Sequence, residues 1–295
     1  MPPRIAHILA TSLALQATAQ TVAPSSFAAS KAIPVPALNS AVDNMKTVPP
    51  MATYPVSVKN KSTLSTIYSD WASFQDGAAL VFKADMDVDC DGIDYRCDGN
   101  LDGQPLTNWG ALSAYEVPFI VIPNKFLEAN PTATPGNNVA AVICNNKMFY
   151  AILGDTNNND PQVTGEASWL LSRACFPEAG LNGNRGHDEP DVTYILFTGE
   201  RAVLPTTALN DKYITDFDKL RSTGDQLVTS LLGNLGIPLL APGSTAHDNQ
   251  GGSGTDSHPG PDDDSDFDAG ASNRLPSALT ALFVVVVLVL ALDQI

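Results

Sequence analysis

The chain has 295 residues and a formal net charge of -16, with 32 acidic and 16 basic residues. A protein this acidic attracts cations and is repelled by nucleic acids and anionic lipid surfaces, so the charge argues against both as partners. Once the two atypical ends are set aside, the remaining length suits one domain and a tail.

Residues 1–19 have the features of a cleaved secretory signal peptide. Arg4 precedes an apolar stretch, and Ala17 and Ala19 stand at the A-x-A spacing of a cleavage site. Residues 20–63 are then an N-terminal extension of the mature chain. Asn60 in this extension begins an N-x-S sequon, which predicts a surface glycosylation site in a secreted protein.

Residues 64–241 are expected to form the folded domain. Segments rich in β-branched and aromatic residues predict strands at 78–86, 117–126, 139–145, 147–155 and 191–199. Segments 167–175 and 216–235 are expected to be helical, and in the second the side chains of Phe217 and several leucines can share one apolar face. This pattern predicts a mainly β (α+β) fold, a compact six-stranded barrel-like or sandwich domain with a few peripheral helices.

The segment 85–102 is crowded with aspartates. From Asp87 its spacing resembles a calcium-binding loop, with Asp98 in place of the expected Glu. The strand-like residues before it argue against an EF-hand. Calcium binding and a solvated acidic turn stay open, but we favour an acidic wall that faces a cationic ligand, formed by Asp85, Asp87, Asp89 and Asp91.

The four cysteines of a secreted chain predict two disulfides, for which three pairings exist. Nearness in sequence favours Cys90 with Cys97, which leaves Cys144 with Cys175. The domain is therefore expected to be stapled by disulfides, although the sequence does not decide the pairing.

Two acids flank the polar loop between the predicted strand 147–155 and the predicted helix 167–175. Asp155 ends the strand and Glu166 precedes the helix, so the chain reversal brings them together. Hydrolysis of a glycosidic bond needs two carboxyl groups at a cleft, one as acid and one as base or nucleophile. Taken alone the pair is weak evidence, because Asp after a strand is a common turn former and Glu at a helix start a common cap.

His187 and Asp188 precede the last predicted strand and are further candidates for ligand contact, although a turn-stabilising role is the default for His187. No second histidine of the predicted domain lies nearby in sequence, so a His-rich zinc site is not expected. The G-x-S-x-G and P-loop motifs are absent. The sequence predicts neither a metal nor a cofactor.

The C-terminal part changes composition. Residues 242–270 are rich in Gly, Ser, Asp and Pro and predict a flexible acidic linker. Residues 271–295 begin with small residues and end in an apolar stretch shorter than the roughly 20 residues of a spanning helix. This pattern favours a removed GPI-attachment signal over a tail anchor or a buried helix.

Several motifs, in order, carry a family resemblance: FKADMDVDCDG, NNVAAVICNNKMFYAILGDTNNNDPQVTGEAS, ACFPEAGLNG and GHDEPDVTYILFTG. From about residue 65 to 235 the chain resembles the fungal chitosanases of glycoside hydrolase family 75. The resemblance implies that the acids of the GD and GEAS motifs, Asp155 and Glu166, are the catalytic pair of an inverting endo-hydrolase of β-1,4-linked glucosamine. The segment between them is slightly shorter than expected for the family.

The sequence therefore predicts a secreted, GPI-anchored, monomeric endo-chitosanase without a cofactor. Its expected partner, chitosan, is a polycation that suits an acidic domain. We assign Asp155 as general acid, since an apolar strand end desolvates it, and Glu166 as general base, since a helix start favours a carboxylate. A catalytically silent cell-wall-binding protein and a carbohydrase acting on chitin or β-glucan remain alternatives.

Overall fold

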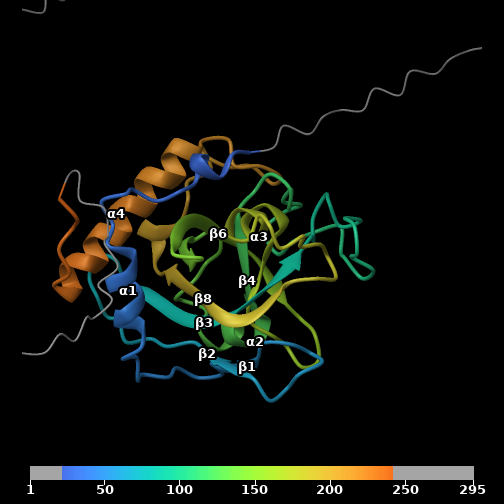
Figure 1. Ribbon diagram of the computed structural model, residues 1–295, viewed down its shortest axis with the longest axis horizontal. Coiled ribbons are helices and arrows are strands. Elements are labelled where there is room, and N and C mark those ends of the chain that lie inside the picture. The colour runs from blue at the N-terminus through green and yellow to red at the C-terminus, as the bar shows by residue number, and fades with distance from the viewer. Residues whose placement is uncertain (1–21, 242–295) are drawn as a thin grey trace, which may run out of the picture. The chain divides into compact units, whose positions relative to one another are not determined.

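The computed structural model describes residues 22–241. Six strands close into a barrel in the order β3-β7-β4-β6-β5-β8 (Figure 1). These strands are β3 Ala79–Asp89, β4 Phe119–Pro123, β5 Val139–Cys144, β6 Lys147–Asn157, β7 Glu166–Ser168 and β8 His187–Phe197. The mainly β, barrel-like fold expected from the sequence is confirmed.

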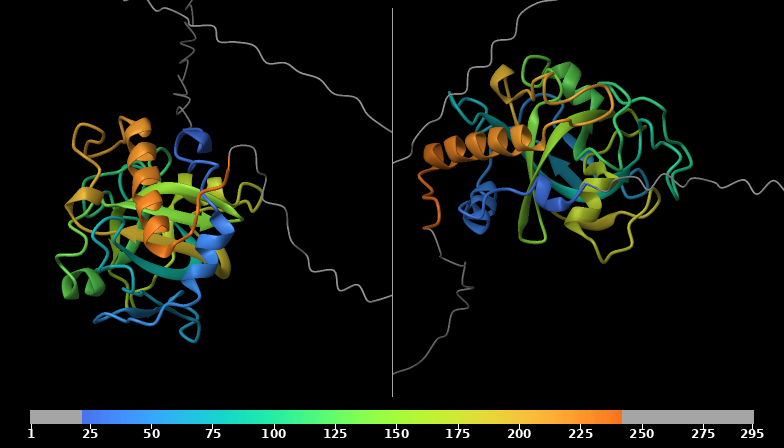
Figure 2. Two further views of the ribbon diagram at one scale, coloured as in Figure 1. Left: turned by 90° about the vertical axis from the view of Figure 1, so that its left-hand side faces the viewer. Right: turned by 90° about the horizontal axis from the view of Figure 1, so that it is seen from above.

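The other elements surround the barrel. A two-stranded sheet, three short helices and one long helix, α4, complete the described fold. They are β1 Thr53–Pro55, β2 Leu64–Thr66, α1 Val35–Val42, α2 Asn124–Ala129, α3 Trp169–Cys175, α4 Phe217–Leu235, and the 3-10 turns η1 Pro24–Ser26 and η2 Glu200–Ala202. Figures 1 and 2 show α1 and α4 on one side of the barrel, opposite the long loop that follows β3.

The barrel strands are formed by the apolar runs that the sequence marks. Every residue of β5 is buried, and in β6 every residue after the first is buried. Inside this core, Tyr194 stacks on Phe82 with 4.7 Å between ring centroids. Gly224 in the middle of α4 lies against the barrel, where a Cβ would be only 2.4 Å from the ring of Tyr150. The close helix–barrel contact therefore requires a residue without a side chain.

The N-terminal extension packs onto the barrel. Phe27 is fully buried and its ring contacts those of Phe149 and Phe217, with centroids 5.5 and 6.4 Å apart. Leu38 of α1 is also buried. The signal peptide, acidic linker and GPI signal expected from the sequence lie outside the described residues. Within residues 22–241, no helix combines the length and apolar character needed to cross a membrane.

The expected helix 167–175 begins later than the sequence indicated. Residues Glu166–Ser168 form the short strand β7, and α3 starts only at Trp169. β7 is parallel to β3 and antiparallel to β4, so it joins these two strands and closes the barrel. Hydrogen bonding to two neighbouring strands overrides the local helical pattern at Ala167 and Ser168.

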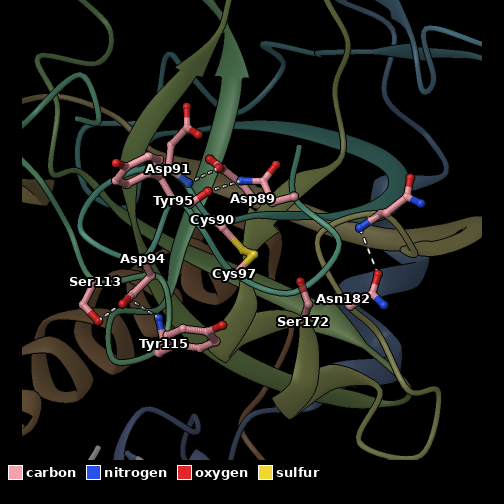
Figure 3. Close-up of a disulfide and its surroundings, with 12 residues drawn as sticks. Asp89, Cys90, Asp91, Asp94, Tyr95, Cys97, Ser113, Tyr115, Ser172 and Asn182 are labelled. Carbon is pink, nitrogen blue, oxygen red and sulfur yellow. Dashed lines mark hydrogen bonds between the residues drawn. A yellow bond between two sulfur atoms is a disulfide. The ribbon is translucent and has the colours of Figure 1, made fainter. Parts of the chain in front are cut away.

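Two disulfides staple the domain. Cys90 is bonded to Cys97 in the loop after β3 (Figure 3), and Cys144 is bonded to Cys175. The second bridge links the end of β5 to the end of α3. This is the pairing that nearness in sequence favoured.

Candidate active site

The barrel strands β3, β6, β7 and β8 bring acidic side chains to one cleft. Glu166 of β7 pairs in register with Asp87 of β3, and Asp155 of β6 pairs with Val121 of β4. The cleft has a volume of about 680 Å³. Its carboxylates, which define what we call the acidic cleft, belong to Asp87, Asp89, Asp91, Asp102, Asp155, Glu166 and Asp188.

Asp155 is 4% exposed, near the end of β6. Its Oδ1 accepts hydrogen bonds from the backbone N–H of Asn108 at 2.9 Å and of Thr156 at 2.8 Å. The Thr156 hydroxyl in turn donates to Asn108 Oδ1 at 2.7 Å, which ties the Asn108 turn to β6. Burial raises the pKa of Asp155 to about 7, although the two backbone donors stabilise its ionised form.

Glu166 is the first residue of β7. Its Oε2 accepts a hydrogen bond from the side-chain amide of Asn157 at 2.8 Å. Burial is the main cause that raises the pKa of Glu166 to about 8, and the carboxylates of Asp87, Asp155 and Asp91 add to the rise. Both acids of the pair therefore hold a proton more readily than a carboxyl in water.

The helix argument for the role of Glu166 is wrong. The N-cap of α3 is Ser168, whose side chain accepts from the backbone N–H of Leu171. Glu166 lies two positions before that cap, in β7. Since the helix dipole acts within the first turn, it does not supply the stabilisation of a Glu166 carboxylate that the sequence suggested.

The four aspartates predicted as a wall separate into two groups. Asp87, Asp89 and Asp91 line the acidic cleft, but Asp85 does not. Asp85 is 4% exposed and its Oδ1 has no hydrogen-bond partner. The reason is the chain at Gly165, where a Cβ would lie 2.1 Å from Asp85 Oδ1, so the loop before β7 covers this carboxyl.

Burial raises the pKa of all four of these aspartates. It raises the pKa of Asp87 to about 6 and that of Asp85 to about 9, with mutual repulsion between carboxylates as a further cause. It also raises the pKa of Asp89 and Asp91. The acidic cleft therefore gains negative charge as the pH rises through this range, and a bound cation would favour the ionised forms.

The calcium interpretation finds partial geometric support. Carboxylate oxygens of Asp89, Asp91 and Asp155 lie within 4.8 Å of one another. However, the segment follows strand β3 instead of a helix, and the Cys90–Cys97 disulfide constrains it. A close set of acids suits an ammonium group as well as a metal ion, so we assign no metal site here.

The loop after β3 is held by its own contacts (Figure 3). Asp94 Oδ2 accepts hydrogen bonds from the Ser113 hydroxyl at 2.7 Å and the Tyr115 backbone N–H at 3.1 Å. The Asp91 backbone N–H donates to Asp89 Oδ1 at 2.7 Å. Together with the disulfide, these contacts fix the edge of the acidic cleft.

The two candidates before β8 have different positions. Asp188 lines the acidic cleft, whereas His187 does not. The His187 ring stacks on Phe176, with centroids 3.8 Å apart, and its Nε2 lies 2.8 Å from Asp191 Oδ1. These contacts fit the structural role that was the default for His187.

Three polar residues at the site were missed from the sequence. Asn108 and Asn157 contact the acid pair, and Lys59 of the N-terminal extension lines the acidic cleft. Asparagines in polar loops are commonly turn formers, so no sequence signal separates these two from the others.

Comparison with known proteins identifies the family of the chain. Residues 86–230 match the protein family described as fungal chitosanase of glycosyl hydrolase group 75. The chain belongs to this family. The matched region begins within β3, contains the other five barrel strands, and includes both acids of the pair. It does not include β1 and β2.

Three curated relatives illustrate the similarity. Endo-chitosanase C of Aspergillus oryzae is 62% identical over 211 residues, which cover 72% of this chain and 55% of that relative. Endo-chitosanase B of Aspergillus oryzae is 41% identical over 165 residues, covering 50% of this chain and 67% of the relative. An endo-chitosanase of Aspergillus fumigatus is 37% identical over 166 residues, covering 50% and 68%. The matched part of the chain thus spans 55% of the length of the first of these relatives.

Proposed function

We propose that this protein is an endo-chitosanase that hydrolyses β-1,4 linkages between glucosamine units by an inverting, two-carboxylate mechanism. The observation that carries the proposal is the placement of the GD and GEAS acids, Asp155 and Glu166, in one acidic cleft. Membership of the group 75 family and the names of the relatives support chitosan as the substrate.

The charge of the cleft suits this substrate. Chitosan carries ammonium groups at mildly acidic pH, and carboxylates such as Asp87 and Asp188 line the cleft where a chain would lie. Complementary charge raises the association rate and disfavours neutral polymers such as chitin and β-glucan. These carboxylates therefore favour chitosan over the substrates of the alternative carbohydrases.

We propose Glu166 as the general acid and Asp155 as the general base, the reverse of the assignment from the sequence. Two backbone N–H groups converge on Asp155 Oδ1 and stabilise its carboxylate, and its pKa is about 7. Glu166 accepts from one side-chain amide, faces several carboxylates, and has a pKa of about 8. The two backbone donors therefore favour the carboxylate form of Asp155, whereas the surrounding carboxylates favour the protonated form of Glu166.

In this mechanism Glu166 gives its proton to the glycosidic oxygen as the bond from C1 to that oxygen breaks. Asp155 takes a proton from a water molecule whose oxygen attacks C1 from the opposite face, so the configuration inverts. Solvent then returns both carboxyl groups to their starting states. Such a reaction needs the two carboxyls about 6.5–9.5 Å apart in the productive complex.

The experiment is a reducing-sugar assay on chitosans of graded acetylation, with chitin and β-glucan alongside. We expect the highest rate on the least acetylated chitosan. Asp155→Asn and Glu166→Gln should each lower turnover by about 10²–10⁴-fold, the range for general acid or base catalysis. Glu178→Gln, at an exposed position just after α3, is the matched control and should keep full activity.

Each result bears on one alternative. Chitosan binding without product would support the silent wall-binding protein, and faster hydrolysis of chitin or β-glucan would support the related carbohydrases. If either acid variant keeps more than about a tenth of the activity, that residue loses its proposed role.

We also propose that the protein is secreted and held at the cell surface by a GPI anchor. The features that support this are the signal-like residues 1–19 and the apolar segment 271–295. An anchored enzyme would act on chitosan outside the cell.

A further inference from the structure

Asn157 stands next to the proposed general acid in a fixed orientation. It is 6% exposed and ends β6, two residues after Asp155. Its Oδ1 accepts hydrogen bonds from the backbone N–H of Val163 at 3.0 Å and of Asn159 at 3.2 Å. Because the amide oxygen is used by two donors, the amide nitrogen is the atom that faces Glu166.

This orientation decides what Asn157 can offer to Glu166. The Asn157 nitrogen lies 2.8 Å from Glu166 Oε2 and can only donate. A proton on Oε2 would point at an N–H group, so Oε2 must act as the acceptor. The proton of the neutral acid therefore belongs on Oε1.

We propose that Asn157 is a positioning residue that holds the proton of Glu166 on Oε1 and so presents it to the glycosidic oxygen. The proposal rests on the proposed function, in which Glu166 is the proton donor. It gives Asn157 a role in the protonation chemistry beyond anchoring the loop between β6 and β7.

The groups around Glu166 make the hydrogen bond from Asn157 important for its protonation. The titratable groups that face Glu166 are acidic and come from several elements: Asp85, Asp87, Asp89, Asp91, Asp155 and the hydroxyl of Tyr194. Lys59 lines the same cleft and its charge acts on Asp87. The carboxylates oppose ionisation of Glu166, whereas the Asn157 amide stabilises its charged form. Removing that amide should therefore raise the pKa of Glu166.

Two variants separate positioning from loop anchoring. Asn157→Ala removes the donor to Glu166 and the acceptor for the loop without adding charge. Asn157→Asp keeps an oxygen for the N–H groups of Val163 and Asn159 but replaces the donor by an acceptor. If Asn157 were only a loop anchor, the Asp variant would behave like the parent protein.

The expected result is a change in the pH profile. In Asn157→Ala the basic limb of kcat/KM should move up by about one pH unit, which is the effect of one hydrogen bond to a charged group. Maximal kcat should fall about tenfold or more with KM little changed, since the acid loses its orientation. Asn157→Asp should move the limb further, because a carboxylate then faces Glu166.

The matched control is Asn138→Ala. Asn138 is fully buried and its amide also bonds backbone groups, with Nδ2 donating to Phe197 O at 3.0 Å and Oδ1 accepting from Gly136 N at 3.1 Å. It does not line the acidic cleft. We expect this variant to lower Tm and leave both limbs of the profile in place.

A substrate-free measurement keeps the inference separate from the proposed function. Titration of the Glu166 carboxyl carbon by NMR should show the same upward pKa shift in the full-length variants. If the parent protein fails to hydrolyse chitosan, the proposed function is lost, but this titration still decides whether Asn157 controls the protonation of Glu166.

The outcomes are distinct. An unchanged pH profile and an unchanged Glu166 titration in both Asn157 variants would overturn the proposal, as would an equal shift in Asn138→Ala. A shift of the acidic limb instead of the basic limb would overturn the proton-donor role and make Glu166 the base. If Asn157→Ala does not fold, Asn157→Asp alone decides between a shifted and an unshifted titration.

Discussion

Replacing Asp85 by asparagine should stabilise the protein at neutral pH. Asp85 lies in β3 beneath the loop before β7, and its Oδ1 has no hydrogen-bond partner. Burial raises its pKa to about 9, and the nearby charges of Asp87, Glu166 and Asp188 add to the rise. At pH 7 the folded protein therefore holds a proton on Asp85 that the unfolded chain releases.

The sign and size follow from this difference in proton binding. A carboxyl with a raised pKa contributes its full stability below the unfolded value near 4, and the contribution is lost as the pH rises towards about 9. Each pH unit in that window is worth about 1.4 kcal/mol, so the loss at pH 7 is at most about 4 kcal/mol. Asparagine has a similar shape and binds no proton. We therefore expect Asp85→Asn to stabilise the fold at pH 7 by about 2–4 kcal/mol, and by almost nothing at pH 4.

Calorimetric unfolding at pH 4, 7 and 8.5 measures this effect. A gain of this size raises Tm by about 4–16 °C in a domain of 150–250 residues, with the larger gain at the higher pH. Asp211→Asn, which changes an exposed carboxylate, is the control and should shift Tm little at any pH. The reasoning is refuted if the Tm difference for Asp85→Asn is the same at all three pH values, or if the variant is less stable at pH 7 than at pH 4 relative to the parent.

Three further predictions concern the acidic cleft, the Cys144–Cys175 disulfide and the proposed GPI anchor. Asp87→Asn should raise KM for chitosan and reduce its salt dependence, with Tm insensitive to EDTA; a Tm that EDTA lowers and calcium restores would instead establish a metal site. Replacing Cys144 and Cys175 by alanine should lower the free energy of unfolding by about 3–4 kcal/mol in denaturant titrations, and an unchanged midpoint would contradict this. Phosphatidylinositol-specific phospholipase C should release the protein from membranes, and mass spectrometry that finds an intact segment 271–295 in the mature chain would disprove GPI anchoring.

The barrel strands could be predicted because each long run of apolar residues is buried over most of its length. The segment 139–145 became β5 and 147–155 became part of β6, since Val, Ile and aromatic side chains favour a buried strand. The three-residue strand β7 could not be found this way. It exists because β3 and β4 supply its hydrogen-bond partners, and those partners are distant in sequence.

The aspartates show where sequence periodicity stops being informative. Asp85, Asp87 and Asp89 alternate along one strand, which predicts a shared face but not a shared depth. The loop at Gly165 covers Asp85, whereas Asp87 and Asp89 reach the cleft. A carboxyl that lines the cleft and one that is covered by a loop therefore have the same sequence pattern.

The sequence by itself predicted the family, singled out Asp155 and Glu166 as candidates, and favoured the cysteine pairing that the structure has. It could do so because the GD and GEAS motifs and the spacing of Cys90 and Cys97 are local features of the chain. Only the tertiary structure decided which groups contact each acid. The hydrogen bonds of Asn108 to Asp155 and of Asn157 to Glu166 join residues 47 and 9 positions apart, and burial within the barrel sets both pKa values. Such contacts depend on how strands from distant parts of the chain pair, and no local pattern of residues encodes that pairing.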